Sequence, residues 1–259
     1  MPTHRAALEE ATYRQLLDSP PNVAVLPWGA TEAHNYHLPH GTDTMQAKAI
    51  ATRAVERANA QGARAITLPA VPFGNNAQQL DQVATIHLST LTAGHLLSDI
   101  VASLKAQGIV RLVIVNAHGG NEFKPLVRDL THRHGVFIAV VNFFQLCPDQ
   151  CAEIFEEPGD HAGELETSLI LHLHPDLVQL EQAGLGASLP FELPGLSGPG
   201  VWTPRPWSRC QPDTGAGNPV AATREKGEAF FEIITSEVGE LVRSVSVAEA
   251  GTSPISDET

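Results

Sequence analysis

The chain has 259 residues, of which 42% are hydrophobic and 17% are charged, a composition typical of globular rather than disordered or fibrous proteins. Acidic residues outnumber basic ones by 29 to 16, which gives a formal net charge of −13. This charge argues against nucleic acid and anionic membrane as partners, because both are bound by basic surfaces. Three cysteines and the lack of an apolar leader or membrane-length run favour a reducing compartment, so we expect the protein in the cytoplasm.

Apolar, strand-like runs alternate with helix-like segments along the chain. The predicted elements are, in order, a helix at 6–17, a strand at 22–26, a helix at 43–60, a strand at 65–68, a helix at 90–107, a strand at 110–115, a helix at 122–134, a strand at 136–141 and a helix at 221–242. Nearly continuous β-branched runs between amphipathic helices are typical of a parallel sheet that is covered on both faces. The sequence therefore predicts an α/β three-layer sandwich with a mostly parallel central sheet, forming a single domain over residues 1–259.

The stretch 184–219 differs from the rest, since it is rich in glycine and proline and carries Trp202 and Trp207. A loop of this length in a compact domain usually serves as a lid, a binding loop or a subunit contact. We expect it to close over the site or to contact another subunit. The polar tail at 248–259 is expected to be frayed.

Ligands of open parallel sheets bind beyond the carboxyl ends of the strands, so the loops after the strands are the first place to look for a site. The loop at 27–43 contains Glu32, His34 and Asp43 among prolines and small residues. Glu32 and His34 are two positions apart, which directs both side chains the same way in extended backbone. Asp43 opens a predicted helix and could cap it instead, but beside the other two residues metal binding is favoured.

Two further clusters have a similar composition. The run 116–121 places His118 and the pair Gly119-Gly120 directly after the strongest predicted strand, where two flanking asparagines could hold the turn. The run 160–168 reads as a helix start that Asp160 would cap, with His161 and carboxylates in the first turns. Plain capping by first-turn acids is the competing interpretation. Glutamate, histidine and aspartate together suit Zn²⁺ or Mn²⁺ rather than a thiolate structural site.

These clusters resemble the creatininase family of creatinine amidohydrolases. The matching stretches are G-A-T-E-A-H at 29–34, H-L-P at 37–39, G-T-D at 41–43, N-A-H-G-G-N at 116–121, H-A-G-E at 161–164 and E-T-S at 166–168, with weaker matches at 84–86 and 218–228. They follow the family's order over roughly 23–231, and together they are highly specific.

The resemblance implies a centre of two divalent ions, with Zn²⁺ favoured and Mn²⁺ or Fe²⁺ as alternatives. The positions that match the family's ligands are Glu32, His34, Asp43 and His118, with Asp43 expected to bridge. Creatininase has a further glutamate ligand where this chain has Gly120, so Glu166 is expected to replace it, ahead of Glu164 and Glu122. The catalytic histidine of the family corresponds to His161, and the family's hexamers imply a homohexamer.

The chain also departs from the family near the expected substrate. Gln78-Gln79 stands where many relatives have Glu-His, and His40 where many have an apolar residue, which argues against creatinine itself. The residues expected to contact a small-molecule substrate are His37, Gln79, Gly119, Gly120, Asn121 and Trp202.

The expected function is hydrolysis of a small, cyclic amide by a metal-activated water, with His161 giving a proton to the leaving nitrogen. The same centre could instead open a lactam, cleave a formamide, or split a carbonyl bond in a keto-sugar or cyclitol. A metal- or ligand-binding protein without turnover is a further alternative, although a pure binder needs no proton donor. A dinucleotide-binding protein is disfavoured, because the first strand–helix turn lacks G-x-G-x-x-G.

Overall fold

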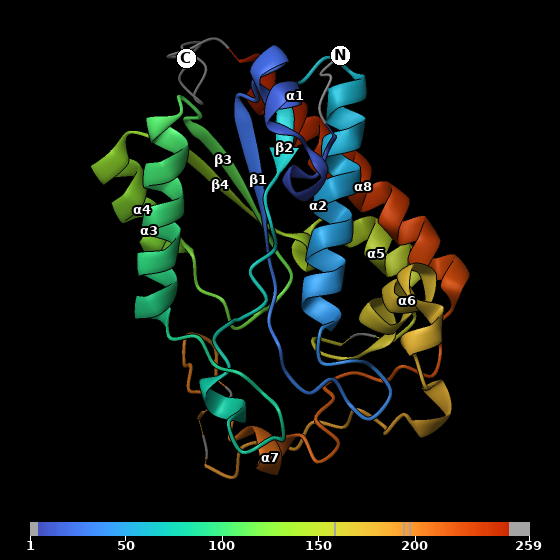
Figure 1. Cartoon of the computed structure of the whole chain (residues 1–259). Helices are drawn as coiled ribbons and strands as arrows, with labels where there is room; N and C mark the ends of the chain where they lie inside the picture. The colour runs from blue at the N-terminus through green and yellow to red at the C-terminus, as the bar shows by residue number, and fades with distance from the viewer. Residues whose placement is uncertain (1–4, 158, 194, 197, 249–259) are drawn as a thin grey trace, which may run out of the picture.

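The computed structural model describes residues 5–157, 159–193, 195–196 and 198–248. Its centre is a parallel sheet with the strand order β2-β1-β3-β4, as Figure 1 shows. The strands are β1 (Val23–Trp28), β2 (Ala65–Thr67), β3 (Arg111–Asn116) and β4 (Phe137–Asn142). The register pairs Trp28 with Asn116 and Asn116 with Asn142, so three strands end level with one another. The loops that follow them therefore leave the sheet along one edge.

The helices of the described ranges alternate with these strands. The α-helices are α1 (Tyr13–Asp18), α2 (Thr42–Ala60), α3 (Thr90–Ala106), α4 (Lys124–His134), α5 (Pro148–Ile154), α6 (Glu164–Leu173), α7 (Trp207–Cys210) and α8 (Arg224–Val247). Short 3-10 turns are η1 (Leu8–Glu10), η2 (Ala77–Gln79), η3 (Phe143–Gln145), η4 (Pro175–Leu177) and η5 (Leu180–Gln182). None of these helices is both long enough and apolar enough to cross a lipid bilayer.

Each face of the sheet has its own apolar core. Val25 and Val113 point to the face that is covered by α2, α6 and α8, where they pack with residues such as Ile50. Leu26 and Ile114 point to the opposite face and pack against α3 and α4. This alternation follows from the pleat of the strands, and burial on both sides explains their continuous hydrophobicity. The prediction of a three-layer α/β sandwich is confirmed.

The predicted helix at 6–17 is wrong, because the chain there forms η1 and then α1. The Thr12 hydroxyl accepts a hydrogen bond from the Gln15 amide at 3.3 Å, and the Gln15 side chain accepts one from the Thr12 amide at 3.0 Å. This reciprocal cap starts a new helix in the middle of an apparently continuous pattern.

The helix that follows His161 begins later than predicted. Its N-cap is Gly163, which makes no side-chain cap bond, so Asp160 does not cap it. The Asp160 carboxylate instead pairs with Arg205 at 3.0 Å, while the main chain of His161 bridges to Ala216. These contacts hold residues 160–161 outside the helix. The final helix starts at Arg224 and continues past the predicted end at 242; the tail beyond Ala248 lies outside the described residues.

Candidate metal centre

Six ionisable side chains converge at the carboxyl edge of the sheet. They come from the loop after β1, the first turn of α2, the loop after β3, the loop before α6 and the first turn of α6. Their potential ligand atoms form three groups, each within 4.8 Å: Glu32 with Asp43 and His118, His34 with Asp43 and Glu166, and Glu32 with His34 and His161. All six are buried except Glu166, which is partly exposed.

Asp43 belongs to two of these groups. Its Oδ1 lies 3.0 Å from Nε2 of His34, and its Oδ2 lies 3.3 Å from Nδ1 of His118. The carboxylate does not cap α2, whose N-cap Gly41 makes no side-chain hydrogen bond. The two oxygens of one buried carboxylate thus face two different histidines, an arrangement that suits a bridge between two cations.

The three histidines are anchored in the same way. Nδ1 of His34 lies 3.1 Å from the carbonyl oxygen of Glu32, Nε2 of His118 lies 3.1 Å from that of Asn75, and Nε2 of His161 lies 2.8 Å from that of Ala33. A carbonyl oxygen can only accept, so each of these outer nitrogens carries the proton. The inner nitrogen of each ring is directed toward the carboxylates, as in histidines that bind metal ions.

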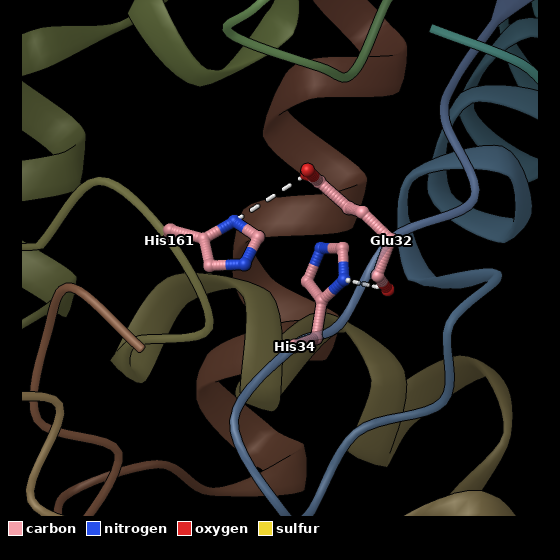
Figure 2. Close-up of side chains that lie close together, drawn as sticks. All are labelled: Glu32, His34 and His161. Carbon is pink, nitrogen blue, oxygen red and sulfur yellow. Dashed lines mark hydrogen bonds and ion pairs between the residues drawn. The ribbon is translucent and has the colours of Figure 1, made fainter. Parts of the chain in front are cut away.

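The Glu32 carboxylate lies between two imidazoles. Its Oε1 is 2.9 Å from Nδ1 of His118 and 3.6 Å from Nδ1 of His161, the second of which Figure 2 shows. Three buried oxygens nevertheless have no hydrogen bond of acceptable geometry among the described residues. They are both carboxylate oxygens of Glu32 and Oδ2 of Asp43. Buried carboxylate oxygens without partners are costly, and a bound cation removes that cost.

The electrostatics of the cluster point the same way. Burial alone would lower the pKa of His34, but the carboxylates of Asp43, Glu166 and Glu32 raise it to about 10. The pKa of His118 is likewise raised well above its usual value against burial by Glu32 and Asp43. Burial raises the pKa of Glu166 to about 7. Without ions, protons on His34 and His118 balance the buried carboxylates, and divalent cations would take over that role.

The turn after β3 is held by asparagine side chains, as the sequence suggested. The Asn116 amide donates to the carbonyl of His118 at 2.9 Å, and its oxygen accepts from the His118 amide at 3.2 Å. Asn121 donates to the Asn116 oxygen at 3.0 Å. A Cβ at Gly120 would lie 2.4 Å from Nε2 of His118 and 2.5 Å from the carbonyl of Asn75. Only glycine at this position leaves the His118 anchor intact.

The two rival glutamates lie outside the ligand groups. Glu164 is buried, but its Oε2 accepts from the amides of Glu156 and Glu157, at 2.8 and 2.7 Å, and its Oε1 pairs with Lys226 at 2.5 Å. Glu122 is exposed. Glu166, in contrast, shares a group with His34 and Asp43.

The residues predicted to touch substrate have varied surroundings, and their roles stay predictions. His37 is buried with Nε2 at 2.8 Å from Oγ1 of Thr167, while Nδ1 has no partner among the described residues. Gln79 is buried, and its Oε1 is similarly unpaired. The side-chain amide of Asn121 is hydrogen-bonded to Asn75, Gly29 and Asn116. A Cβ at Gly119 would point into open space. The side chain of Trp202 is 84% exposed.

Sequence reasoning missed the residues that act through the main chain. Ala33 and Asn75 supply only their carbonyl oxygens to the histidines, and such contacts do not depend on side-chain type. It also treated Trp207 only as part of a loop, whereas its ring packs against His161 with the centroids 5.3 Å apart.

Buried carboxylates and histidines at the carboxyl edge of a doubly covered parallel sheet form a centre suited to divalent metal ions. The family of the chain makes it a metal-dependent hydrolase that acts on amide C–N bonds. The chain belongs to the creatininase family, whose model, described as creatinine amidohydrolase, matches residues 6–242.

Relatives and solved structures agree with this membership. The chain is 34% identical over 240 residues to a mycofactocin precursor peptide peptidase of Mycobacterium tuberculosis (strain ATCC 25618 / H37Rv), covering 89% of this chain and 88% of the relative. It is 26% identical over 241 residues to a creatinine amidohydrolase of Pseudomonas putida, covering 85% and 88%. A structure from Bacteroides fragilis NCTC 9343, named for creatinine amidohydrolase, aligns with a TM-score of 0.89 at 38% identity over 95% of this chain and 98% of the other. A manganese form of creatininase shares the fold with a TM-score of 0.77 at 24% identity, covering 94% of this chain and 100% of the other.

Proposed function

We propose that this chain hydrolyses the C–N bond of a small amide with two divalent ions, Zn²⁺ in first place and Mn²⁺ or Fe²⁺ as alternatives. Glu32, Asp43 and His118 would hold one ion, and His34, Asp43 and Glu166 the other. The observation that carries this proposal is the shared anchoring of the three histidines, which turns every inner ring nitrogen toward buried carboxylates. Among the described residues, both oxygens of Glu32 and Oδ2 of Asp43 have no hydrogen bond of acceptable geometry.

The donor set fits such ions. Carboxylate oxygens and imidazole nitrogens suit Zn²⁺ and Mn²⁺, and the two ligand groups meet at Asp43. Divalent ions bound there supply a Lewis acid for the amide carbonyl and lower the pKa of water at the site toward neutrality. The protein's own contribution is to hold the ligands apart from bulk water and in fixed tautomers.

His161 is proposed to move the proton of the reaction at Nδ1. Its Nε2 donates to the Ala33 carbonyl, which leaves the Nδ1 lone pair facing Glu32. Burial and the nearby His34 lower the pKa of His161, so the imidazole is neutral at neutral pH and can take a proton from the attacking water. The resulting imidazolium then gives that proton to the leaving nitrogen. The competing role of His161 is that of a metal ligand, because its ring nitrogen also forms a possible ligand group with Glu32 and His34.

For the substrate we propose a small cyclic amide, in line with the family's creatinine amidohydrolases. The second candidate is an amide bond of a short peptide. It is favoured by the higher similarity to the mycofactocin precursor peptide peptidase, 34% against 26% for the creatinine amidohydrolase. The Gln78-Gln79 pair and the buried, unpaired oxygen of Gln79 make creatinine itself the less favoured cyclic amide.

We further propose that the chain forms one domain, acts in the cytoplasm and assembles as a homohexamer. The hexamer rests on the family resemblance. Light scattering on the purified protein would measure the assembly directly.

The test begins with metal analysis of protein purified without chelator, followed by a screen of cyclic amides, formamides, keto-sugars and short peptides. We expect two ions per chain and release of an amine from one of the amides. Glu32→Gln should lose metal and turnover together, because it removes a ligand charge. His161→Ala should keep its metal but lose turnover.

Two results would count against the proposal. Full activity of His161→Ala would remove the proton-transfer role, and loss of metal in that variant would make His161 a ligand. If the wild-type protein binds no divalent ion, the dinuclear centre itself is wrong.

A further inference from the structure

The segment that leads to α8 folds back onto the loop that carries His161. The amides of Asp160 and His161 both donate to the carbonyl of Ala216, at 2.8 and 3.2 Å, and the amide of Ala216 donates to the carbonyl of His161 at 2.8 Å. Beside this bridge, a Cβ at Gly217 would lie 2.9 Å from Gly159. The contact of backbone on backbone fixes the main chain of His161 but not the rotation of its ring.

Trp207 occupies the space beside that ring. Its side chain is buried, its Nε1 donates to the carbonyl of Thr214 at 3.2 Å, and its ring meets the His161 imidazole at an angle of 89°. His34 also lies beside the imidazole, with the ring centroids 4.2 Å apart. The imidazole thus contacts two rings, of which the indole is perpendicular to it and the His34 ring is tilted.

Trp207 is itself held in place. The guanidinium of Arg205 lies 4.3 Å from the centroid of the indole ring, a distance typical of a cation–π contact. The same guanidinium donates to Oδ2 of Asp160 at 3.0 Å. Asp160 directly precedes His161. A continuous series of contacts therefore links the backbone at His161 to its own ring, through Asp160, Arg205 and Trp207.

We propose that Trp207, held by Arg205 and Asp160, is a positioning residue that keeps Nδ1 of His161 directed at the metal centre. The single hydrogen bond from Nε2 to the Ala33 carbonyl fixes one corner of the imidazole and leaves the ring able to tilt about it. The indole blocks that tilt. This inference rests on the proposed proton transfer by His161, and it assigns Trp207 a role other than that of a mobile lid.

The sequence offers a matched control. Trp202 lies in the same glycine- and proline-rich segment but is 84% exposed, whereas Trp207 is 3% exposed. Removal of either indole deletes the same group, and only removal of Trp207 frees the imidazole.

The first measurement needs no substrate. In ¹⁵N-histidine-labelled, Zn²⁺-loaded protein, the Nε2–H signal of His161, identified by its loss in His161→Ala, should be protected by the Ala33 carbonyl. We expect Trp207→Ala to speed the hydrogen exchange of this signal at least about ten-fold, with Zn²⁺ content unchanged, because local opening governs exchange. Trp207→Phe should restore most of the protection. Trp202→Ala should leave this exchange rate in the substrate-free protein unchanged, and it serves as a control for this measurement alone because Trp202 is a predicted substrate contact.

The second measurement uses the amide found in the substrate screen. Trp207→Ala should lower kcat by about 10- to 100-fold with little change in KM, since a small misplacement of a catalytic group has that cost. Arg205→Met should show a smaller loss, and its combination with Trp207→Ala should be no worse than Trp207→Ala alone, because both act through one ring.

An unchanged Nε2–H exchange rate in Trp207→Ala would overturn the inference. So would a variant in which only KM rises or only the metal content falls, with kcat unchanged. If Trp207→Ala does not fold, Arg205→Met decides the question by the same readouts: an exchange rate and a kcat equal to those of the wild type would overturn the inference. An inactive His161→Ala beside a fully active Trp207→Ala defeats only the positioning role. A fully active His161→Ala defeats the proton transfer proposed above.

Discussion

Gly120 shows how one missing side chain shapes the centre. The family resemblance implies a glutamate ligand at this position, but here a Cβ would lie 2.4 Å from Nε2 of His118. The space is instead taken by the bond from His118 to the carbonyl of Asn75. Glu166 brings a carboxylate to the cluster from α6, in the group that it forms with His34 and Asp43. The absence of a side chain at position 120 and the anchoring of His118 are therefore linked.

This link predicts a contrast between two adjacent glycines. Gly120→Ala should break the His118–Asn75 hydrogen bond and lower metal affinity about 10- to 100-fold, the usual effect of losing such a supporting contact. Gly119→Ala should bind metal normally, because a Cβ there meets nothing within 4 Å. Titration with Zn²⁺ against a competing chelator measures both. Equal affinity in the two variants would show that the anchor is dispensable.

At this scale the sequence predicted which residues meet, but not how they are held. The clusters around Glu32, His118 and His161 could be found because carboxylates and histidines in short loops after strands are unusual. The tautomers could not, since they depend on the carbonyls of Ala33 and Asn75. Asp160 was misread as a cap because its partner, Arg205, is distant in sequence.

Among the elements, the crossing of α6 and α8 sets the position of Glu166. A Cβ at Gly227 of α8 would lie 1.8 Å from the carbonyl oxygen of Ser168 in α6, and the Ser168 hydroxyl accepts from the amide of Thr223 at 3.2 Å. The two helices touch backbone to backbone, and this close approach helps to bring the first turn of α6 to the centre.

Gly227→Ala should therefore destabilise the protein. Separating the helices to fit one methyl group should cost about 1–3 kcal/mol, the usual cost of overpacking a core. Glu228→Ala, at the next and exposed position of the same helix, should change stability by less than about 0.5 kcal/mol. Denaturant unfolding of the two variants measures the difference. Equal stability would mean that α8 shifts freely against α6.

The strands and the longer helices could be predicted well because they carry continuous periodic patterns. The predicted helix boundaries are wrong where a local hydrogen bond interrupts the hydrophobic pattern, as at the reciprocal cap of Thr12 and Gln15. The predicted start of α6 is too early because the bridge between His161 and Ala216 holds the chain at residues 160–161 outside the helix.

For the whole molecule, the centre joins segments from β1, α2, β3 and α6, so bound ions should stabilise the fold. Ligands that bind only the folded state stabilise it by mass action, by about 2.7 kcal/mol at a hundred times Kd. We expect chelation to lower Tm by roughly 5–10 °C for a chain of this size and Zn²⁺ to restore it.

Asp43→Asn provides the control for this experiment, because it removes the carboxylate shared by both ligand groups. Its Tm should not respond to chelator, and calorimetry of the two proteins with and without Zn²⁺ measures this. A Tm of the wild-type protein that chelator leaves unchanged would contradict a centre that binds the segments together.

The overall architecture was predictable because parallel sheets bring the carboxyl ends of their strands to one edge. The path of the stretch 184–219 was not, since no periodic pattern guides it. Its placement depends on paired contacts such as Leu189 with Cys210 and Gly186 with Gly217, which appear only once the chain is folded.

The described chain ends at the edge of the sheet remote from the metal centre. Arg111 opens β3, and its guanidinium donates to the carbonyl oxygens of Ser246 and Ala248 at 3.0 and 2.6 Å. The centre lies at the other end of the strands (Figure 1). A carrier protein or a solid support attached at Ala248 would therefore be joined at the end of the sheet opposite the metal centre.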